Sequence, residues 1–345
     1  MNFDEYQQKF ISEAKLKGKS EEYILKCLNY AHNLYINKLP IIFDQNHLIE
    51  LMGIDAEYIY KVCNKPSLFY RKFKIFKKNG DSRTIYEPLP TLKKAQYFIL
   101  NEILSHLNTS IYSKAYKKKS SIKDNVKFHR KQRYVLCMDI EKYFDNISSY
   151  SVYNRLFSVG YKNDVAMMIT KLCTLKGSLP QGAPTSPILS NALTVNLDNK
   201  LAILAKANNV RYTRYADDIT ISGDFYLKSI VKKIKMILWQ EGFTANNDKT
   251  RVMSQGCRQV VTGIVVNNKA QVDKKKRKEI RKNMYFIQKF GLQNHLEHIH
   301  YEKDEYSYLK QLRGKMGFVL FVNPKDNEIK GYMEKLKNLI NEKSI

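Results

Sequence analysis

The alternation of apolar and polar residues is clearest in Val210–Gly223, where Ile219 and Ile221 alternate with residues that carry hydroxyl groups. A period of two indicates a β-strand with one buried face. A second extended segment lies on the other side of an Ala-Asp-Asp triplet. We therefore predict a strand, a tight turn and a strand, with Asp217 and Asp218 at the exposed tip of this hairpin.

The stretch Tyr134–Ile140 is apolar almost throughout, which suits a buried central strand. Asp139 lies at its end, where the strand meets solvent. An acid at such a place is more often a helix cap than a ligand, and aspartate is also common in ordinary turns. Together, however, Asp139, Asp217 and Asp218 favour a cluster of three carboxylates. Because adjacent carboxylates repel, the simplest partner for them is a hard divalent cation such as magnesium.

A basic β-hairpin is predicted between residues 69 and 90. Bases alternate with apolar residues over Phe69–Phe76, Lys78–Asp81 is a turn signal, and an extended pattern resumes at Arg83. These basic side chains could simply form a solvent-exposed face. Alternatively, the hairpin could be a lid whose positive charges hold a triphosphate and a template backbone. We favour the lid because the carboxylates lie downstream. Apolar residues at helical spacing then predict a helix with one buried face: Leu92, Ala95, Ile99, Ile103 and Leu107.

Three prolines and a glycine fix a non-helical path over Leu179–Pro187. A helix is expected to begin near Pro187, with Ser186 as its cap. Its apolar face would consist of Leu189, Leu193, Leu197, Leu201 and Leu204. The loop is either a rigid connection or a surface that places Gln181 and exposed backbone against an incoming base pair.

The segments that follow the acidic hairpin combine a helix, strands and a basic C-terminal part. Apolar spacing predicts an amphipathic helix that Gly242 stops. Phe243–Lys249 is then expected to be a turn, and Thr250–Met253 a strand. Arg258–Asn268 has the pattern of another strand around a glycine. Beyond Asp273 the chain becomes helical and basic.

The first 64 residues contain helical patterns at Tyr23–Tyr35 and His47–Val62, but they carry no readable motif. The sequence leaves open whether this segment serves packing or is an accessory element. We place domain boundaries after residues 64 and 255. The resulting parts are an N-terminal helical segment (1–64), a central part that contains the three acids (65–255) and a basic helical part (256–345).

The charge of the chain narrows the choice of partners. The 345 residues carry a formal net charge of +26, which predicts a polyanionic partner. Residues 61–134 alone contain 19 Lys and Arg against 4 Asp and Glu. No apolar run approaches the length of a membrane span, and the first residues lack the order of a secretion signal. Five cysteines without a C-x-x-C pair argue against a zinc site or a disulfide framework.

The order of these pieces closely resembles the bacterial reverse transcriptases, and within them the retron type, from about Ser67 to Phe321. Five motifs of that family occur here in the family's order. They are the fingers hairpin with Arg71 and Arg83, the first palm motif with Asp139 and Phe144, LPQGxxxSP at Leu179–Pro187, YADD at Tyr215–Asp218 and N-x-x-K at Asn246 and Lys249. Each motif is modest alone, but five in the right order are highly specific.

Two further motifs resemble those of retron enzymes in particular. Val261-Thr262-Gly263 matches their VTG triplet, and Asn125–His129 matches their N-A-x-x-H motif, with Val126 in place of alanine. Without that match, His129 alone would be read as a structural histidine.

The resemblance implies an α+β fold of the right-hand polymerase type, with fingers, an antiparallel palm sheet backed by helices, and a helical thumb. It implies RNA-directed DNA polymerase activity with two magnesium ions, held by the side chains of Asp139, Asp217 and Asp218 and by the backbone carbonyl of Ile140. By the same resemblance, the three aspartates are the expected catalytic residues.

The resemblance also assigns nucleotide-binding and RNA-binding residues. Arg71 and Arg83 would clamp the triphosphate, Phe144 would lie under the sugar and exclude a 2′-hydroxyl, and Gln181 would face the base pair. Lys249 is a candidate proton donor to the leaving pyrophosphate. RNA binding is expected at these residues: Asn125, His129, Val261, Thr262, Gly263, Lys274, Lys275, Lys276, Arg277 and Lys278.

The implied partners are dNTPs, a cognate noncoding RNA on whose 2′-hydroxyl DNA synthesis starts, the branched product msDNA, and a separate effector protein in anti-phage defence. No membrane is expected, and the expected location is the bacterial cytoplasm. Two alternatives stay open. One is a group II intron-like or other defence-associated reverse transcriptase, against which the VTG triplet argues. The other is a catalytically idle RNA-binding protein of the same fold, against which the three intact acids argue.

Overall fold

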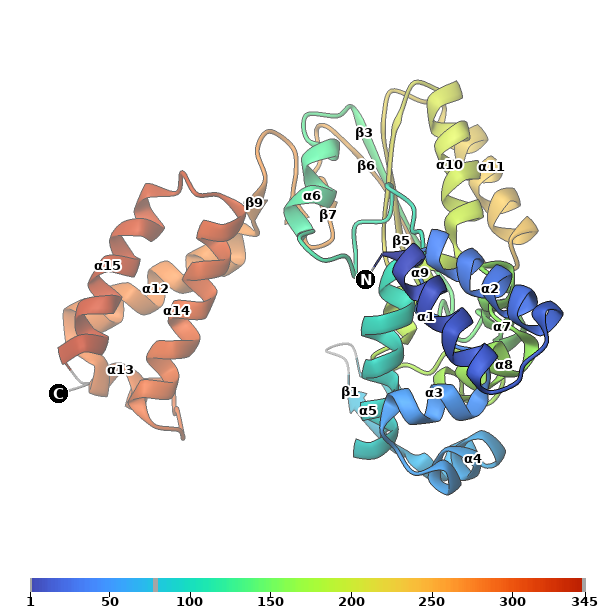
Figure 1. Cartoon of the computed structure of the whole chain (residues 1–345). Coiled ribbons are helices and arrows are strands. Elements are labelled where there is room, and N and C mark those ends of the chain that lie inside the picture. Colours follow the sequence, from blue (N-terminus) through green and yellow to red (C-terminus); the bar gives the residue numbers. More distant parts are fainter. Residues whose placement is uncertain (1, 77–79, 343–345) are drawn as a thin grey trace. The chain divides into compact units, whose positions relative to one another are not determined.

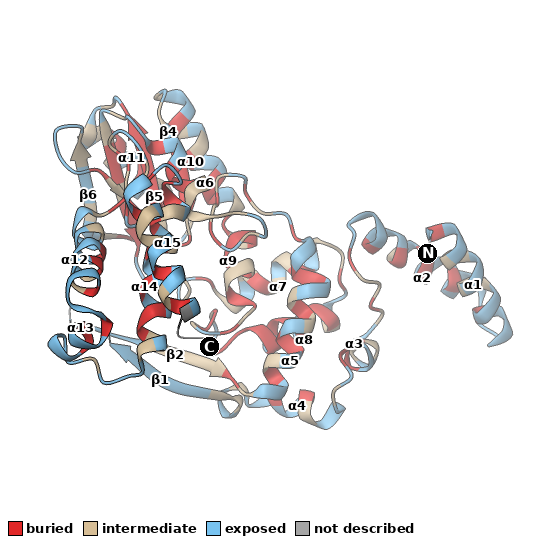
Figure 2. Ribbon diagram, turned by 90° about the vertical axis from the view of Figure 1, so that its left-hand side faces the viewer, coloured by how far each residue is buried: buried red, intermediate tan, exposed pale blue. Residues whose placement is uncertain are grey.

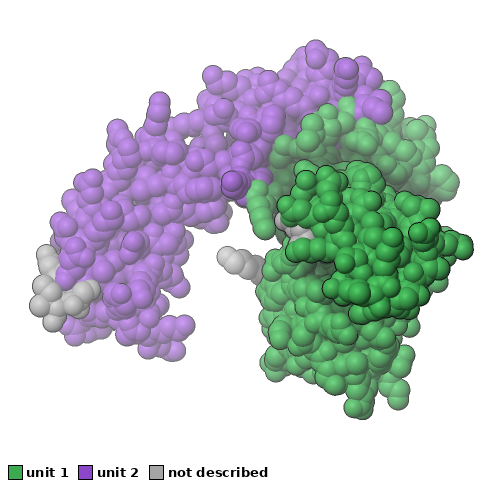
Figure 3. All heavy atoms as spheres, viewed as in Figure 1, with its two compact units in different colours: residues 1–118, 140–202, 231–245 green, residues 119–139, 203–230, 246–345 purple. Residues whose placement is uncertain are grey.

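The computed structural model describes residues 2–76 and 80–342. They form two compact units that are interleaved along the chain (Figure 3). Unit 1 comprises residues 1–118, 140–202 and 231–245, and unit 2 comprises residues 119–139, 203–230 and 246–345. Figure 1 shows the order of helices and strands. The domain boundaries expected at residues 64 and 255 stay a prediction.

Unit 1 begins with four helices: α1 (Phe3–Leu16), α2 (Glu21–Ile36), α3 (Gln45–Met52) and α4 (Ala56–Asn64). The helix predicted at Tyr23–Tyr35 is confirmed by α2. The prediction of one helix over His47–Val62 is wrong, because the chain forms two helices there, α3 and α4. Gly53 ends α3 in the left-handed conformation, and the Asp55 side chain caps α4 by accepting a hydrogen bond from the Tyr58 amide.

The predicted basic hairpin is present in unit 1. After a short 3₁₀ turn, η1 (Pro66–Phe69), strands β1 (Tyr70–Phe76) and β2 (Ser82–Pro88) pair antiparallel. Part of the predicted turn Lys78–Asp81 lies outside the described residues. β1 is exposed along almost its whole length (Figure 2).

The helix predicted after the hairpin begins as α5 (Pro90–Phe98). It continues as a π-helical turn, η2 (Ile99–Ile103), and a 3₁₀ turn, η3 (Leu104–His106). All five apolar residues that predicted its inner face are buried.

The rest of unit 1 is mostly helical and contains α7 (Ser149–Ser158), α8 (Asn163–Cys173) and α9 (Ser186–Leu193). The single helix predicted from Pro187 to Leu204 is wrong, because the chain breaks at Thr194 and continues as α10 (Val195–Ala207). The Thr194 hydroxyl donates to the Ser190 carbonyl at 2.7 Å, which competes with the backbone ladder. Ser186 does not act as the predicted cap, since its hydroxyl donates to the Pro180 carbonyl at 2.7 Å.

Unit 2 contains a four-stranded sheet in the order β4-β5-β3-β6. The bounds are β3 (Tyr134–Ile140), β4 (Arg211–Tyr215), β5 (Asp218–Gly223) and β6 (Ala245–Ser254). β5 pairs antiparallel with both β3 and β4, so the predicted strand–turn–strand is confirmed. β6 begins inside the stretch that was expected to be a turn. Helix α11 (Leu227–Gln240), most of which belongs to unit 1, is the predicted amphipathic helix that ends before Gly242.

Two short segments precede β3 in unit 2: helix α6 (Ile122–Val126) and the 3₁₀ turn η4 (Lys127–His129). After β6, strands β7 (Val260–Val261), β8 (Ile264–Val265) and β9 (Gln271–Val272) form a small antiparallel sheet. Arg258–Asn268 is therefore not one strand, as predicted, but a tight hairpin. Thr262 and Gly263 turn the chain with φ angles of 45° and 81°, a conformation that an extended strand cannot contain.

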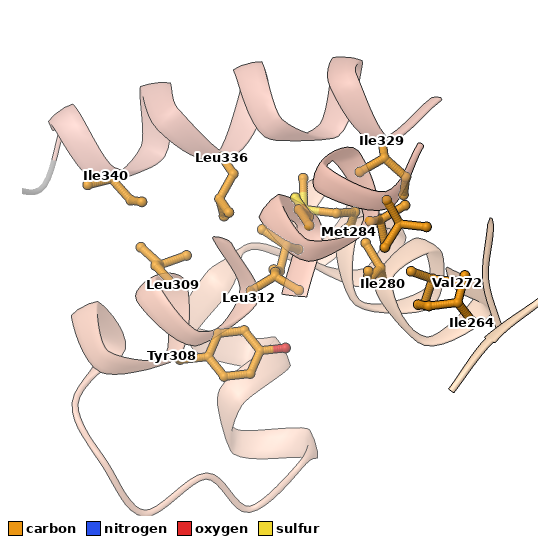
Figure 4. Close-up of a cluster of buried hydrophobic side chains, with 14 of the residues drawn as sticks. Ile264, Val272, Ile280, Met284, Tyr308, Leu309, Leu312, Ile329, Leu336 and Ile340 are labelled. Atoms are coloured by element: carbon orange, nitrogen blue, oxygen red, sulfur yellow. The ribbon is translucent and has the colours of Figure 1, made fainter. Parts of the chain in front are cut away.

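The C-terminal part of unit 2 is helical, as predicted. It consists of α12 (Lys274–Phe290), α13 (Leu292–His298), α14 (Glu305–Val322) and α15 (Asn327–Glu342). Figure 4 shows the buried side chains that these helices share, among them Met284, Leu312 and Leu336, together with Ile264 and Val272. Within the described part of the chain, no helix has the length and apolar character needed to span a membrane.

Candidate active site

The three predicted acids lie together in unit 2. One carboxylate oxygen of each residue lies within 4.8 Å of those of the other two. The sheet register explains this, because Asp139 at the end of β3 lies directly opposite Asp218 at the start of β5. Asp217 belongs to the two-residue turn that joins β4 to β5. Two separate strands and one turn thus bring together residues that are 79 positions apart in the sequence.

The turn that carries Asp217 has an unusual backbone. Ala216 has a φ of 58°, a conformation that residues with a side chain seldom adopt. The fully buried Arg214 lies beside it, and its Nη1 atom donates to the Ala216 carbonyl at 2.9 Å. A bond from a buried guanidinium can hold a strained turn in place, and such strain is typical of functional sites.

Electrostatics favour a cation at the three acids. Burial, together with the neighbouring charges of Asp217 and Asp139, raises the pKa of the Asp218 carboxyl to about 6. Lys249 and Arg251 oppose this rise. The Nζ atom of Lys249 lies 2.8 Å from Oδ1 of Asp139, and the side chain of Asp139 is only 12% exposed. The charges of Asp217 and Asp139 thus disfavour ionisation of Asp218, and a bound cation would oppose this effect.

The donor set fits a hard divalent metal ion. The three side chains supply only oxygen atoms, which magnesium and similar ions prefer over nitrogen and sulfur. Asp217 and Asp218, at the tip of the hairpin, are half-buried. Among the described residues, these three form the one cluster of acidic, histidine or cysteine side chains close enough to share an ion.

The N-x-x-K pattern has a local structural explanation in β6. The Lys249 amide donates to Oδ1 of Asn246 at 3.3 Å, and the Thr250 hydroxyl donates to the Asn246 carbonyl at 2.8 Å. These contacts fix the backbone from which Lys249 extends to Asp139.

The two predicted triphosphate ligands share one face of the hairpin in unit 1. Arg71 lies opposite Glu87, and Arg83 lies opposite Ile75. Because alternate residues of a strand point to the same side, Arg71 and Arg83 project from the same face, about 13 Å apart along the strands. Both are exposed. Arg71 also lines a cavity of about 510 Å³ with Lys93, Lys94 and Tyr97 among its other lining residues.

The predicted loop around Gln181 is attached to that hairpin. The amide of Tyr86 donates to the Gln181 carbonyl at 2.7 Å. At Gly182 the φ angle is 122°, and a Cβ atom there would lie 2.7 Å from the Ile85 side chain and 2.8 Å from the Tyr86 carbonyl. Only glycine fits so close an approach. Arg71, Arg83 and Gln181 thus belong to one connected part of unit 1, which consists of the hairpin and the loop bonded to it.

Phe144 and Ile140 also belong to unit 1. Phe144 is half-buried and makes an edge-to-face contact with Tyr143, with ring centroids 5.4 Å apart. Ile140 is buried and directly follows Asp139 in the chain. The place of the unit 1 residues relative to the three acids stays a prediction.

The residues predicted to bind RNA differ in exposure. Lys274, Lys275, Lys276 and Lys278 are exposed in the first turns of α12, whereas Arg277 forms an ion pair with Asp326 at 3.0 Å. Gly263 is exposed and Thr262 half-buried, but Val261 is buried. The RNA-binding role of the exposed residues stays a prediction.

Asn125 and His129 are fully buried, so their side chains have no surface for direct contact with RNA. The ring nitrogens of His129 lie 2.7 Å from the hydroxyl oxygens of Ser222 and Thr213. Sequence reasoning missed Arg214, Thr213 and Ser222 altogether. The available signal was a charged residue, Arg214, at a buried position of a strand.

Comparison with known proteins places these features in a family. A family model described as reverse transcriptase (RNA-dependent DNA polymerase) matches residues 75–309. The chain is 30% identical over 322 residues to the retron Ec86 reverse transcriptase of Escherichia coli, covering 91% of this chain and 96% of that protein. It is 30% identical over 279 residues to the retron Mx65 reverse transcriptase of Myxococcus xanthus, covering 75% of this chain and 62% of that protein.

A solved structure of telomerase from Candida albicans with a fragment of telomeric RNA matches 82% of this chain and 62% of that chain. The sequence identity is 14% and the TM-score 0.43, which is too low to assign a function.

Proposed function

The chain belongs to the reverse transcriptase family, with retron enzymes among its relatives, and we propose that it synthesises branched msDNA on its own structured noncoding RNA. Its activity is that of an RNA-directed DNA polymerase with the α+β right-hand fold of the family. The observation that carries the proposal is the cluster of Asp139, Asp217 and Asp218, in a chain that matches a retron enzyme over 91% of its length.

The acids account for the dependence on a divalent metal that the family implies. Asp139, Asp217 and Asp218 would hold two magnesium ions, with the Ile140 carbonyl as a further ligand. When bound, such ions would lower the pKa of the attacking hydroxyl and neutralise charge on the phosphates. Phosphoryl transfer otherwise requires positioning and little covalent participation by the protein.

The remaining site residues are assigned to positioning and proton transfer. Arg71 and Arg83, on one face of the hairpin, would hold the triphosphate, since guanidinium groups bind phosphate oxygens in pairs. Gln181, in the loop attached to that hairpin, would contact the incoming base pair. Phe144 would exclude a 2′-hydroxyl by steric clash. Lys249 would deliver a proton to the leaving pyrophosphate.

We assign RNA binding to the exposed lysines of α12 and to the Thr262–Gly263 turn. Positively charged side chains in the first turn of a helix interact unfavourably with the helix dipole and lower the stability of the helix. At the start of α12, the Asp273 side chain accepts from the Lys275 amide at 2.8 Å and offsets part of this cost. An ordinary solvated helix has no need for such an arrangement, whereas phosphate binding uses it directly.

The test is to express the chain together with the DNA that flanks its gene and to isolate the nucleic acid it produces. We expect a DNA strand joined to RNA through a 2′,5′ branch, whose mobility changes after treatment with RNase and debranching enzyme. Asp217→Asn is the matched control and should give no DNA. If the purified protein extends an ordinary primer on RNA but no branched product forms with any neighbouring RNA, the group II intron-like alternative is favoured.

A role in anti-phage defence with a separate effector protein is part of the proposal. Cells that carry the whole locus should show fewer phage plaques than cells that carry the Asp217→Asn form. Equal plaque numbers in both would remove the defence role and leave the polymerase activity untouched.

A further inference from the structure

The polar side chains of Asn125 and His129 are fully buried. They contact the strands β4 and β5, which flank the turn that carries Asp217. Asn125 belongs to α6 and His129 to η4. The sequence motif that contains them suggested RNA binding. Their burial directs attention to what they contact inside unit 2.

The two residues belong to one continuous chain of hydrogen bonds. Nδ1 of His129 lies 2.7 Å from the Ser222 hydroxyl, and Nε2 lies 2.7 Å from the Thr213 hydroxyl. The Thr213 hydroxyl donates to Oδ1 of Asn125 at 2.6 Å. Nδ2 of Asn125 donates to the Thr262 hydroxyl at 3.4 Å. The network thus connects the hairpin β4–β5 to the turn between β7 and β8.

The direction of every proton in this network follows from chemistry. Thr213 has one hydroxyl proton and gives it to Asn125, so its oxygen must accept from Nε2–H of His129. Burial lowers the pKa of His129 to about 3, so the ring is neutral near pH 7. A neutral ring carries one proton, so Nδ1 has none and accepts from the Ser222 hydroxyl. A fully satisfied buried network of this kind fixes one arrangement of its surroundings.

The two hydroxyls that His129 contacts lie on different strands. Thr213 of β4 is opposite Thr220 of β5, and Ser222 is two residues further along β5 on the same face. Such diagonal neighbours are about 7–8 Å apart, a separation that an imidazole ring with a hydrogen bond on each side can span. His129 therefore links β4 to β5 across their shared face.

The acids lie at the other end of the same strands. Asp218 is four residues from Ser222, or about 13 Å along β5, and Asp217 is four residues from Thr213. A rotation or slip of either strand at His129 would move the carboxylates at the tip. Displacements of about 1 Å can cost about 100-fold in rate when reacting groups must be aligned.

We propose that Asn125 and His129 are positioning residues for DNA synthesis, which fix the two strands of the catalytic hairpin from behind, and that they are not RNA ligands. The inference rests on the proposed function only for its polymerase chemistry. In this proposal, the Asn125–His129 motif and the turn at Thr262 belong to one hydrogen-bond network that holds the acid-bearing strands in place.

The test is RNA-templated primer extension on an ordinary primer, so that failure to form branched msDNA does not affect it. His129→Leu removes both hydrogen bonds, Thr213→Val removes two at nearly constant shape, and His129→Gln can replace both bonds of the ring. Each variant is measured for kcat, for KM of dNTP, for the magnesium concentration at half-maximal rate, for RNA affinity and for melting temperature.

We expect His129→Leu and Thr213→Val to lower kcat by about 10–100-fold and to raise the magnesium requirement, with RNA affinity and KM nearly unchanged. His129→Gln should restore most of the kcat. The matched control is His295→Leu, which removes another buried histidine, bonded to the Tyr308 hydroxyl at 2.8 Å within the C-terminal helices. It should lower the melting temperature without changing kcat.

Two results would overturn the inference. One is a loss of RNA affinity at unchanged kcat, which would assign the motif to RNA recognition. The other is an unchanged kcat with only a lower melting temperature, which would make His129 an ordinary core residue. If His129→Leu does not fold, Ser222→Ala, which removes a single bond, decides between the same outcomes.

Discussion

The ammonium nitrogen of Lys249 lies 2.8 Å from Oδ1 of Asp139, so a lysine neutralises part of the acid cluster. Asp139 is nearly buried, whereas the Lys249 side chain is half exposed. A cation bound by Asp139 competes with this contact. The same lysine is the proposed proton donor to pyrophosphate, so its removal should affect binding and chemistry in opposite directions.

Lys249→Met should strengthen the binding of a divalent ion to the protein alone, because a competing positive charge is lost. It should also lower kcat by about 100-fold, the typical contribution of a general acid. Mn²⁺ binding followed by electron paramagnetic resonance tests the first effect, and single-turnover extension tests the second. Lys249→Arg, which keeps the charge, should bind Mn²⁺ like the wild type. A normal kcat in Lys249→Met would remove the lysine from proton transfer.

Asp217→Asn should abolish polymerisation while RNA binding remains nearly intact, since phosphate contacts elsewhere supply the affinity. The measurements are primer extension and RNA binding at the same salt concentration. Asp248→Asn is the matched control, because Asp248 is an exposed aspartate of β6 outside the acid cluster. Ordinary dNTP incorporation by Asp217→Asn would show that the metal assignment is incorrect.

Phe144→Ala should admit ribonucleotides, because a ring that blocks a hydroxyl discriminates by clash and not by attraction. The quantity to measure is the ratio of kcat/KM for rNTP to that for dNTP. Phe144→Tyr retains the ring and should retain the discrimination. An unchanged ratio in the alanine variant would leave Phe144 with only its packing against Tyr143.

Stability should depend on pH through His129. Its pKa is about 6.5 in an unfolded chain but about 3 in the folded protein. Between these values the unfolded chain binds a proton that the folded protein does not, so acid favours unfolding. The stabilising effect of the neutral ring is complete above pH 6.5 and falls with decreasing pH by up to about 1.4 kcal/mol per pH unit.

Urea denaturation at pH 7, 6 and 5 measures this effect. The unfolding free energy of His129→Gln should fall less steeply than that of the wild type. Thr213→Val keeps the buried ring and should keep the steeper dependence. Parallel curves for wild type and His129→Gln would mean that the histidine is accessible to protons.

Exchange of residues 256–345 for the same region of another retron enzyme should change which RNA primes DNA synthesis at moderate salt. The lysines of α12 alone would bind any RNA, so selectivity is expected from the fixed turn at Thr262–Gly263. The readout is the identity of the RNA joined to new DNA. An active chimera that still uses only the original RNA would place recognition outside residues 256–345, for example in residues 1–64.

The sequence predicted the elements whose signals are local. Alternation at Ile219 and Ile221 gave the acidic hairpin, and the apolar run before Asp139 gave the central strand that meets it. The breaks at Gly53 and Thr194 escaped prediction, because apolar residues continue at helical spacing on both sides of them. The turn at Thr262 escaped for a related reason, since valine and isoleucine surround it and favour a strand.

The contacts that hold the acid-bearing strands in place could not be predicted from local sequence patterns. His129 contacts Thr213 and Ser222, which lie 84 and 93 residues further along the chain, and Asn125 contacts Thr262 at a separation of 137. No spacing rule connects such residues, because the sheet topology decides which of them meet. A motif that resembled an RNA-binding element therefore proved to be buried behind the acids.

The order of the strands in the sheet has a consequence for synthesis on the ribosome. β3, which ends in Asp139, leaves the ribosome about 80 residues before β5 begins, and β6 follows later still. At about 5–20 residues per second, this apolar strand waits about 4–16 s for its first partner. During that time both of its edges are unpaired, which favours aggregation. Slow translation and an occupied chaperone pool should therefore limit the yield of active enzyme more than the stability of the finished fold does.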